Sequence, residues 1–229
     1  PGNASRQPMR SRARCSIEPL TAAPVQNSSS VAISSSSSGA AASAAAIRSR
    51  AAELMTSSLG LHGVQHLAGL IRLLPERDPH ERLYEAFKVV LDHLDRFDVA
   101  GPLIIRFELE MLNELGFGLD LTRCAATGTR DDLAWVSPKS ARAVSREAGE
   151  PYRDKLLPLP PFLVEGQRQP GSEITYQDLI EGFRLTDFFL NRNVYVPRGI
   201  KTGDLRPSLI AALEKKYRAE FPWNFNLPG

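Results

Sequence analysis

Residues 107–128, FELEMLNELGFGLDLTRCAATG, run from an amphipathic helix into a cysteine turn. A zinc ribbon needs two C-x-x-C knuckles, because four thiolates at tetrahedral spacing close a structural zinc site. The first knuckle here reads Cys124-Ala-Ala-Thr127, and the position of the second reads Ser145-Arg-Glu-Ala148. Cys124 is therefore a lone remnant ligand. The segment predicts a ribbon-like β-hairpin module without zinc, and no other cofactor is expected.

Helical periodicity flanks this ribbon on both sides. Apolar residues recur at three- and four-residue steps, which is the pattern of one buried helix face. A capping box from Thr175 to Asp178 and a start signal at Asp204 introduce the last two helices. The expected helices cover residues 61–74, 83–97, 102–115, 175–189 and 204–218, and the expected strands cover 133–136 and 142–144. The fold class is mainly α, a helical bundle with a small degenerate zinc-ribbon-like β-hairpin module.

The composition is ordinary for a globular protein, with 42% hydrophobic residues in 229. No apolar run approaches the roughly 20 residues that a membrane span needs, so no membrane contact is expected. The two cysteines, Cys15 and Cys124, fit reduced cytosolic thiols better than a disulfide framework.

Positive charge is concentrated at the front of the chain. Residues 1–50 hold six arginines and one acid, Glu18, which gives +5 and leaves about −3 for the remainder of a chain of net charge +2. Such an arm can neutralise phosphates without reading base sequence, so Arg10, Arg12 and Arg14 are candidate DNA contacts. The alternatives are a solvated tail without a partner, and an organelle transit peptide, whose Arg, Ser and Ala bias this arm shares.

Four separated strings resemble the RecO family of bacterial recombination mediators. They are LLPERDPHERLYEAF, RFELEMLNELGFGLDLTRCAATG, VSPKSARAVSREAG and LTDFFLNRNV, which agree in order and spacing, and the resemblance covers residues 51–213. It implies an N-terminal OB-fold, a helical domain and an often degenerate zinc ribbon. It also implies a non-catalytic role in the RecFOR pathway of DNA repair and recombination. There the family binds single-stranded DNA, the protein RecR and the C-terminal tail of single-strand binding protein, and promotes RecA loading and strand annealing. The expected location is the bacterial cytoplasm, associated with the nucleoid.

The chain departs from the family pattern at its front. Only residues 1–20 correspond to the OB-fold, as a remnant of its end, and a single strand cannot close a barrel. The chain begins with Pro rather than Met, which indicates a fragment or a truncated reading frame. The expected division is a Ser/Ala-rich disordered linker at 21–46, the first part of the helical domain at 47–118, the ribbon-like insertion at 119–166, and the last part of the helical domain with the C-terminal tail at 167–229.

A partner surface is predicted on the helical domain, where the resemblance places the tail of single-strand binding protein. Arg72 and Arg106 are each flanked by apolar residues and would rim a groove, with Phe107 beside it. Such a groove suits an acidic, aromatic tail, because a pocket takes the ring while a guanidinium pairs with the carboxylate. The alternative is two exposed helix arginines whose stems cover apolar surface.

A second set of candidate DNA contacts lies late in the chain. Arg192, Arg198 and Lys201, with Tyr195 and Arg206 in the same run, would pair with phosphates and stack on bases. The alternative is a solvated loop.

Motifs for catalysis are absent from the sequence. There is no phosphate-binding loop of the Walker or dinucleotide kind and no Gly-x-Ser-x-Gly elbow. His62 and His66 share a helix face without an H-E-x-x-H arrangement, so they are interpreted as ordinary helix histidines. The sequence therefore predicts a mediator that is not an enzyme. The alternative is a helical protein-interaction scaffold that has lost DNA binding with its OB-fold.

Overall fold

The computed structural model describes residues 38–75, 79–167, 172–201 and 203–221. All of them belong to one compact unit, Ala32–Gly229. The predicted OB-fold remnant at 1–20, and with it Arg10, Arg12 and Arg14, lies outside the described residues.

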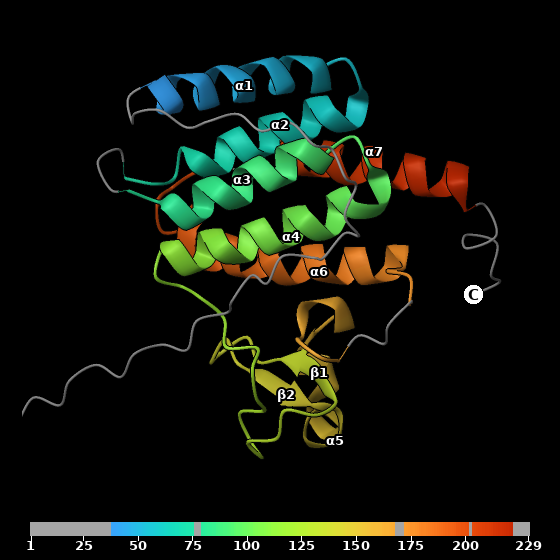
Figure 1. The fold of residues 1–229 in the computed structure, drawn as a ribbon. Coiled ribbons are helices and arrows are strands. Elements are labelled where there is room, and N and C mark those ends of the chain that lie inside the picture. The colour runs from blue at the N-terminus through green and yellow to red at the C-terminus, as the bar shows by residue number, and fades with distance from the viewer. Residues whose placement is uncertain (1–37, 76–78, 168–171, 202, 222–229) are drawn as a thin grey trace, which may run out of the picture. The chain divides into compact units, whose positions relative to one another are not determined.

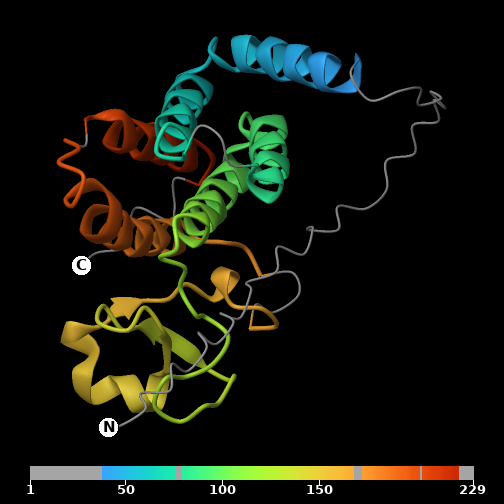
Figure 2. The same ribbon diagram turned by 90° about the vertical axis from the view of Figure 1, so that its left-hand side faces the viewer.

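The described chain is mainly helical, as the sequence predicts. Figures 1 and 2 show the long helices stacked together, with a small β module beyond α4 and α6. The long helices are α1 Ser38–Leu54, α2 Ser58–Ile71, α3 Glu81–His93, α4 Phe97–Glu114, α6 Tyr176–Leu190 and α7 Leu205–Glu220. The shorter ones are α5 Arg146–Gly149, the 3-10 turns η1 Glu150–Lys155 and η2 Pro161–Leu163, and a π-helical turn η3 Asn191–Tyr195.

Two helix starts differ from the sequence-based expectation. α1 begins at Ser38, inside the segment predicted to be a disordered linker, and its run of alanines is the best helix-forming composition available. α4 begins at Phe97, whereas Pro102 was expected in its first turn. Pro102 instead lies inside α4, where it lacks the N–H that would donate to the carbonyl of Asp98 in a regular helix.

The core is centred on α4, which packs against α3, α6, α7 and α2. Its buried face carries Ile104, Phe107 and Met111, each no more than 1% exposed. α4 and α6 approach closely because Gly182 has no side chain: a Cβ there would lie 2.9 Å from Cδ1 of Ile105. A larger residue at this position would push the two central helices apart.

The β module is an antiparallel sheet of three short strands in the order β2-β1-β3. β1 Leu133–Val136 pairs with β2 Ala143–Ser145, so that Leu133 faces Ser145 and Val136 faces Ala143. This is the predicted hairpin, with its second strand one residue later. β3 Leu157–Pro158 adds a third strand from the proline-rich segment, and it pairs with the other edge of β1.

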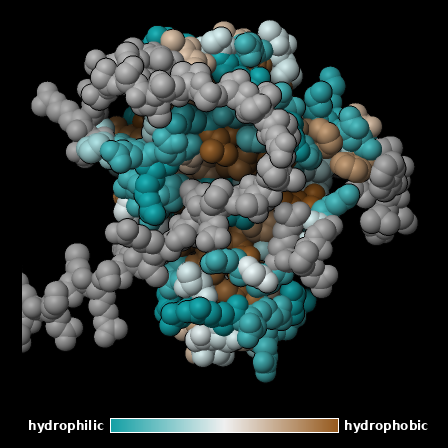
Figure 3. Space-filling view, in the orientation of Figure 1, coloured by the Kyte–Doolittle hydropathy of each residue, from teal (hydrophilic) through white to brown (hydrophobic). Residues whose placement is uncertain are grey.

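The surface is mixed in character. On the face drawn in Figure 3, hydrophilic residues cover most of the helices and the β module, and hydrophobic residues show mainly in the hollows between them. Among the residues that the structure describes, none of the helices has the length and hydropathy of a membrane span.

Candidate functional site

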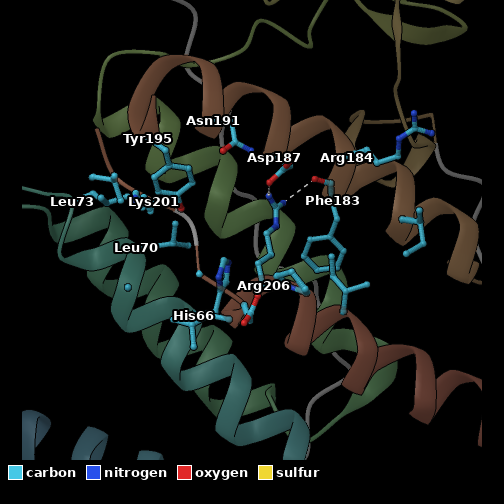
Figure 4. Close-up of a pocket in the computed structure, with 18 residues that line it drawn as sticks. His66, Leu70, Leu73, Phe183, Arg184, Asp187, Asn191, Tyr195, Lys201 and Arg206 are labelled. Atoms are coloured by element: carbon cyan, nitrogen blue, oxygen red, sulfur yellow. Dashed lines mark hydrogen bonds and ion pairs between the residues drawn. The ribbon is translucent and has the colours of Figure 1, made fainter. Parts of the chain in front are cut away.

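A pocket of about 580 Å³ lies where α2, α6, η3 and the start of α7 meet. Figure 4 shows His66 and Leu70 of α2, Leu73 just after that helix, Phe183 and Asp187 of α6, and Arg206 at the start of α7. Aliphatic residues form much of its wall, and two of its polar residues, His66 and Arg206, are almost fully enclosed. The full lining is His66, Gly69, Leu70, Leu73, Ile180, Phe183, Arg184, Asp187, Asn191, Tyr195, Ile200, Lys201, Gly203, Asp204, Leu205, Arg206, Pro207 and Ile210.

A buried carboxylate lies behind the pocket floor. Glu108 of α4 is 0% exposed and accepts hydrogen bonds from three different helices. His66 Nε2 lies 2.8 Å from Glu108 Oε1, Arg206 Nη2 donates to Oε2 over 2.8 Å, and the Thr186 hydroxyl donates to the same oxygen. Burial alone would raise the pKa of Glu108, but Arg206 together with the His66 and Thr186 hydrogen bonds outweighs it and holds that pKa below its ordinary value.

Arg206 joins this carboxylate to α6. Its side chain is 12% exposed, and Nη1 donates to Asp187 Oδ1 over 2.5 Å. Nη2 also donates to the carbonyl of Phe183 over 2.8 Å, and the guanidinium lies 5.5 Å from the centroid of the Phe183 ring. A guanidinium offers five donors in a fixed fork, so one side chain can hold α4, α6 and α7 together. Arg206 therefore holds three helices together. In the sequence it lies in the same run as the candidate DNA contacts.

The mouth of the pocket combines cations with exposed apolar residues. Arg184 and Lys201 are exposed, and neither makes an ion pair within the described part of the chain. Arg198 stands close by, because its Nη1 donates to the carbonyl of Leu73 over 2.8 Å. Ile200 and Leu205 line the same mouth and are 39% and 42% exposed.

The late DNA-contact candidates occupy one segment after α6. Lys201 and Arg198 stand at the pocket mouth as described above, whereas Arg192 reaches the other way. Arg192 donates to the carbonyl of Pro138 in the β module and lies 6.0 Å from the centroid of the Phe188 ring. All three cations are exposed. The structure thus brings Arg198 and Lys201 together and fixes Arg192 nearer the β module.

The predicted partner surface is spread over separate parts of the helical domain. Arg72 is exposed at the C-cap of α2, and Arg106 is half-buried and donates to the carbonyl of Phe162 in η2. Neither of them lines the pocket. Phe107 is 1% exposed and packs in the core with its ring 6.2 Å from that of Phe87. It supports α4 from inside and offers no outer surface.

At the cysteine turn, the Cys124 thiol is hydrogen-bonded to Thr127 and Ser145, two of the positions where a complete ribbon would carry cysteines. Cys124 is 1% exposed, and its Sγ accepts from the N–H of Ser145 at 3.2 Å, the Ser145 hydroxyl at 3.4 Å and the N–H of Thr127 at 3.5 Å. Burial raises the pKa of the thiol, but the Ser145 and Thr127 hydrogen bonds lower it to about 6. Within the described residues no cluster of three or more His, Cys, Asp or Glu is arranged for a metal ion.

Sequence reasoning missed the network of His66, Glu108, Thr186 and Arg206. One signal was present, because Glu108 follows Phe107 and precedes Met111 on the face of α4 that periodicity predicts to be buried. An acid in such a stripe needs charged or hydrogen-bonding partners, since an unpaired buried charge is prohibitively costly. Nothing in the sequence says which residues those partners are.

Comparisons with known proteins identify the family. The model of the family described as "Recombination protein O C terminal" matches residues 60–201. A protein of Mesorhizobium japonicum named DNA repair protein RecO is 55% identical over 172 residues, which are 75% of this chain and 67% of that protein. A protein of Rhizobium leguminosarum bv. trifolii with the same name is 54% identical over 167 residues, 72% of this chain and 64% of its own length.

A third relative agrees with these two. A protein of Rhodopseudomonas palustris, again named DNA repair protein RecO, is 54% identical over 170 residues, 74% of this chain and 68% of its own. The chain thus spans about two thirds of the length of the curated relatives it matches. No solved structure matches it. A family model over more than half of the chain, together with relatives at this identity, shows that the chain belongs to the RecO family of DNA repair proteins.

Proposed function

We propose that this chain is a non-catalytic recombination mediator, which holds single-stranded DNA and partner proteins together so that a recombinase can be loaded and complementary strands annealed. The direct partners are RecR and the C-terminal tail of single-strand binding protein. RecA is an indirect partner, because its loading is promoted. Its place is the bacterial cytoplasm, at the nucleoid. Membership in the RecO family supports the class of function. The exposed cations after α6 are the observation that carries the DNA contact.

Those cations are held in a form suited to phosphates. Arg192 and Arg198 each use part of the guanidinium on a backbone carbonyl, Pro138 and Leu73 respectively, which fixes the side chain while other N–H donors of the fork remain. Lys201 adds a point charge beside Arg198. Ordered cations along one segment track a phosphate backbone without reading bases. Arg10, Arg12 and Arg14 extend the same chemistry along the basic arm.

For the partner tail we keep Arg106 as the main proposed contact, with exposed Arg72 as a separate second contact and buried Phe107 as a supporting residue. Arg106 is anchored on the Phe162 carbonyl, so its guanidinium is oriented before a carboxylate arrives. Buried Phe107 would act by holding α4 in place beneath it. Arg106→Glu should weaken a labelled acidic tail peptide by about tenfold, the effect of losing one charge-assisted pair. Arg218→Glu, at the far end of α7, is the matched control, and equal effects of the two would retire this surface.

The DNA contact is tested with a labelled oligothymidine and fluorescence anisotropy at two salt concentrations. Each phosphate neutralised adds about 0.7 to the slope of log affinity against log salt for a single strand. Arg192→Glu and Lys201→Glu should therefore lower both the affinity and the salt slope. Lys216→Glu, an exposed cation on α7, should change neither. No binding at low salt would refute the proposed mediator and leave a helical scaffold that binds proteins only.

A further inference from the structure

Two large apolar side chains are exposed to solvent at the mouth of the pocket. Ile200 and Leu205 are 39% and 42% exposed, and they line the pocket of about 580 Å³ together with Leu70 of α2 and with Leu73, which follows that helix. Exposed apolar residues gathered at a hollow with a polar rim mark interaction sites more often than residues scattered singly. Burying such an aliphatic side chain against another apolar surface is favourable.

The floor of the pocket is pre-formed and carries no unpaired cation. Arg206 is engaged by Glu108 and Asp187, and Glu108 has further partners in His66 and Thr186. Such a floor does not need to rearrange when an apolar group enters, which removes one cost of binding. It also offers no strong charge to a phosphate that reached it.

The rim has the opposite character. Arg184 and Lys201 line it, and Arg198 is fixed beside Leu73. Two acids also line the pocket: Asp204 is exposed, and Asp187, with a side chain 49% exposed, is paired with Arg206. An incoming group therefore meets cations at the mouth and aliphatic walls inside, which complements an apolar side chain carried by an acidic segment.

A nucleobase fits this pocket less well than an aliphatic or aromatic side chain does. Bases bind single-strand sites by stacking on an exposed aromatic face. Phe183 is 2% exposed and its ring is already covered by the Arg206 guanidinium at 5.5 Å. Tyr195 is half-buried, and burial raises the pKa of its phenol to about 12. The apolar remainder of the lining is Leu, Ile and Pro, which do not stack, and the one imidazole, that of His66, is 5% exposed and hydrogen-bonded to Glu108.

We propose that the pocket between α2, α6 and α7 is a second protein-docking site, which takes one apolar side chain from an acidic segment of a partner. It is separate from the surface of Arg72 and Arg106, since neither of those residues lines it. It also adds a contact that the proposed mediator function does not require. The segment needs no terminal carboxylate, because the cations stand at the mouth, where side-chain carboxylates flank the inserted residue.

The probe is a fluorescein-labelled decapeptide, blocked at both ends, with one central leucine flanked by glutamates. Its binding to the whole chain is followed by anisotropy. Ile200→Ser removes apolar contact without changing charge and should weaken this peptide about tenfold. Val196→Ser is the matched control, because Val196 is 73% exposed on the same segment and does not line the pocket. Replacing the peptide's leucine with alanine should cost a similar factor.

Charge is tested separately. Lys201→Glu should weaken the peptide about tenfold at low salt and less at high salt, while Lys216→Glu and Arg106→Glu should leave it unchanged. Circular dichroism melts check that Ile200→Ser and Lys201→Glu are folded, and Leu205→Ser provides a second apolar variant if one of them is not. Absence of binding by the unaltered chain, or equal weakening by Val196→Ser and Ile200→Ser, would overturn the site.

The oligothymidine assay separates this inference from the proposed function. Ile200→Ser should leave DNA binding unchanged, because it alters no charge. Loss of DNA binding with the peptide unaffected would mean that the pocket takes a base, and the protein-docking site would be wrong. Peptide binding by a chain that binds no DNA would support the docking site and refute the DNA contact alone.

Discussion

Replacing Glu108 with glutamine tests the buried network directly. The substitution keeps the size of the side chain and removes its charge, which leaves Arg206 with Asp187 as its single acidic partner. Asp187 has a side chain 49% exposed to solvent, so it compensates Arg206 much less than the fully buried Glu108 does. The amide also replaces one acceptor oxygen with an N–H₂ donor, so the hydrogen bond with His66 survives only if the imidazole changes tautomer and accepts at Nε2.

The expected loss follows from the cost of an uncompensated buried charge. Removing one partner of a buried ion pair costs about 3–5 kcal/mol, and the residual Asp187 contact places this case near the lower end, at about 3 kcal/mol. For a chain of this size, 1 kcal/mol shifts the melting temperature by about 2–4 °C, so the variant should melt about 6–12 °C lower. Since domains are stable by only about 5–15 kcal/mol, a loss of about 3 kcal/mol removes roughly a fifth to three fifths of the stability.

Urea denaturation followed by circular dichroism measures this loss, and a double-mutant cycle with Arg206→Met isolates the pair. The two substitutions should be strongly non-additive, because Arg206 is costly to bury only while it remains charged and unpaired. A Glu108→Gln variant within 1 kcal/mol of the unaltered protein, or additive effects in the cycle, would show that the network is not a clamp.

The loss of stability in the Glu108→Gln variant should depend on pH in a defined direction. Folding lowers the pKa of Glu108 below its ordinary value of 4.5, so the carboxylate stabilises the folded state above that value. This contribution is lost as pH falls through the lower, folded pKa. The difference in unfolding free energy between the protein and Glu108→Gln should therefore be constant above about pH 4.5 and shrink in more acidic solution. A difference that grows with acidity would contradict the charge assignment.

Three further predictions concern the β module and the start of α6. Gly149→Ala should destabilise the protein by about 1–3 kcal/mol in urea melts, because a Cβ there would lie 2.3 Å from Cδ1 of Trp135; unchanged stability would show that the ring can move aside. The thiol of Cys124 should titrate at about 6 by absorbance at 240 nm, and Ser145→Ala should raise that pKa. Because folding lowers it from 9.0, stability relative to a Cys124→Ala variant should rise with pH between about 6 and 9, and a flat profile would count against the thiolate. Thr175→Ala removes a capping box and should cost about 1 kcal/mol, against a negligible loss for the exposed Gln177→Ala.

Local signals were sufficient for most of the helices. The capping box at Thr175 and the periodicity before Pro75 place α6 and α2 close to their observed positions, because both signals depend on neighbouring residues. The start of α4 was misplaced because Pro102 favours a first turn by intrinsic geometry, and tertiary packing of Ala100 and Gly101 extends the helix past it. The hairpin strands were found from β-type runs and turn residues, whereas β3 is only two residues long and gives no pattern.

The candidate site was harder to predict because its parts are distant in sequence. His66 lies 42 residues from Glu108, and Arg206 lies 98 residues from it. A cation's sequence position does not reveal whether it faces solvent, so Arg206 and Lys201 looked equivalent although one is enclosed and the other exposed. The roles of Arg192, Arg198 and Lys201 in DNA binding, and of Arg72 and Arg106 in partner binding, stay predictions until the binding assays are done.

The separation of 98 residues between Glu108 and Arg206 also bears on how the polypeptide matures at the ribosome. At about 5–20 residues per second, the acid of α4 is made roughly 5–20 s before its cation. Until α7 is synthesised, the nascent helices cannot exclude water from that carboxylate without penalty, so they should associate loosely. Completion of the last helix would then trigger final consolidation, and prematurely terminated products would stay open to proteolytic clearance.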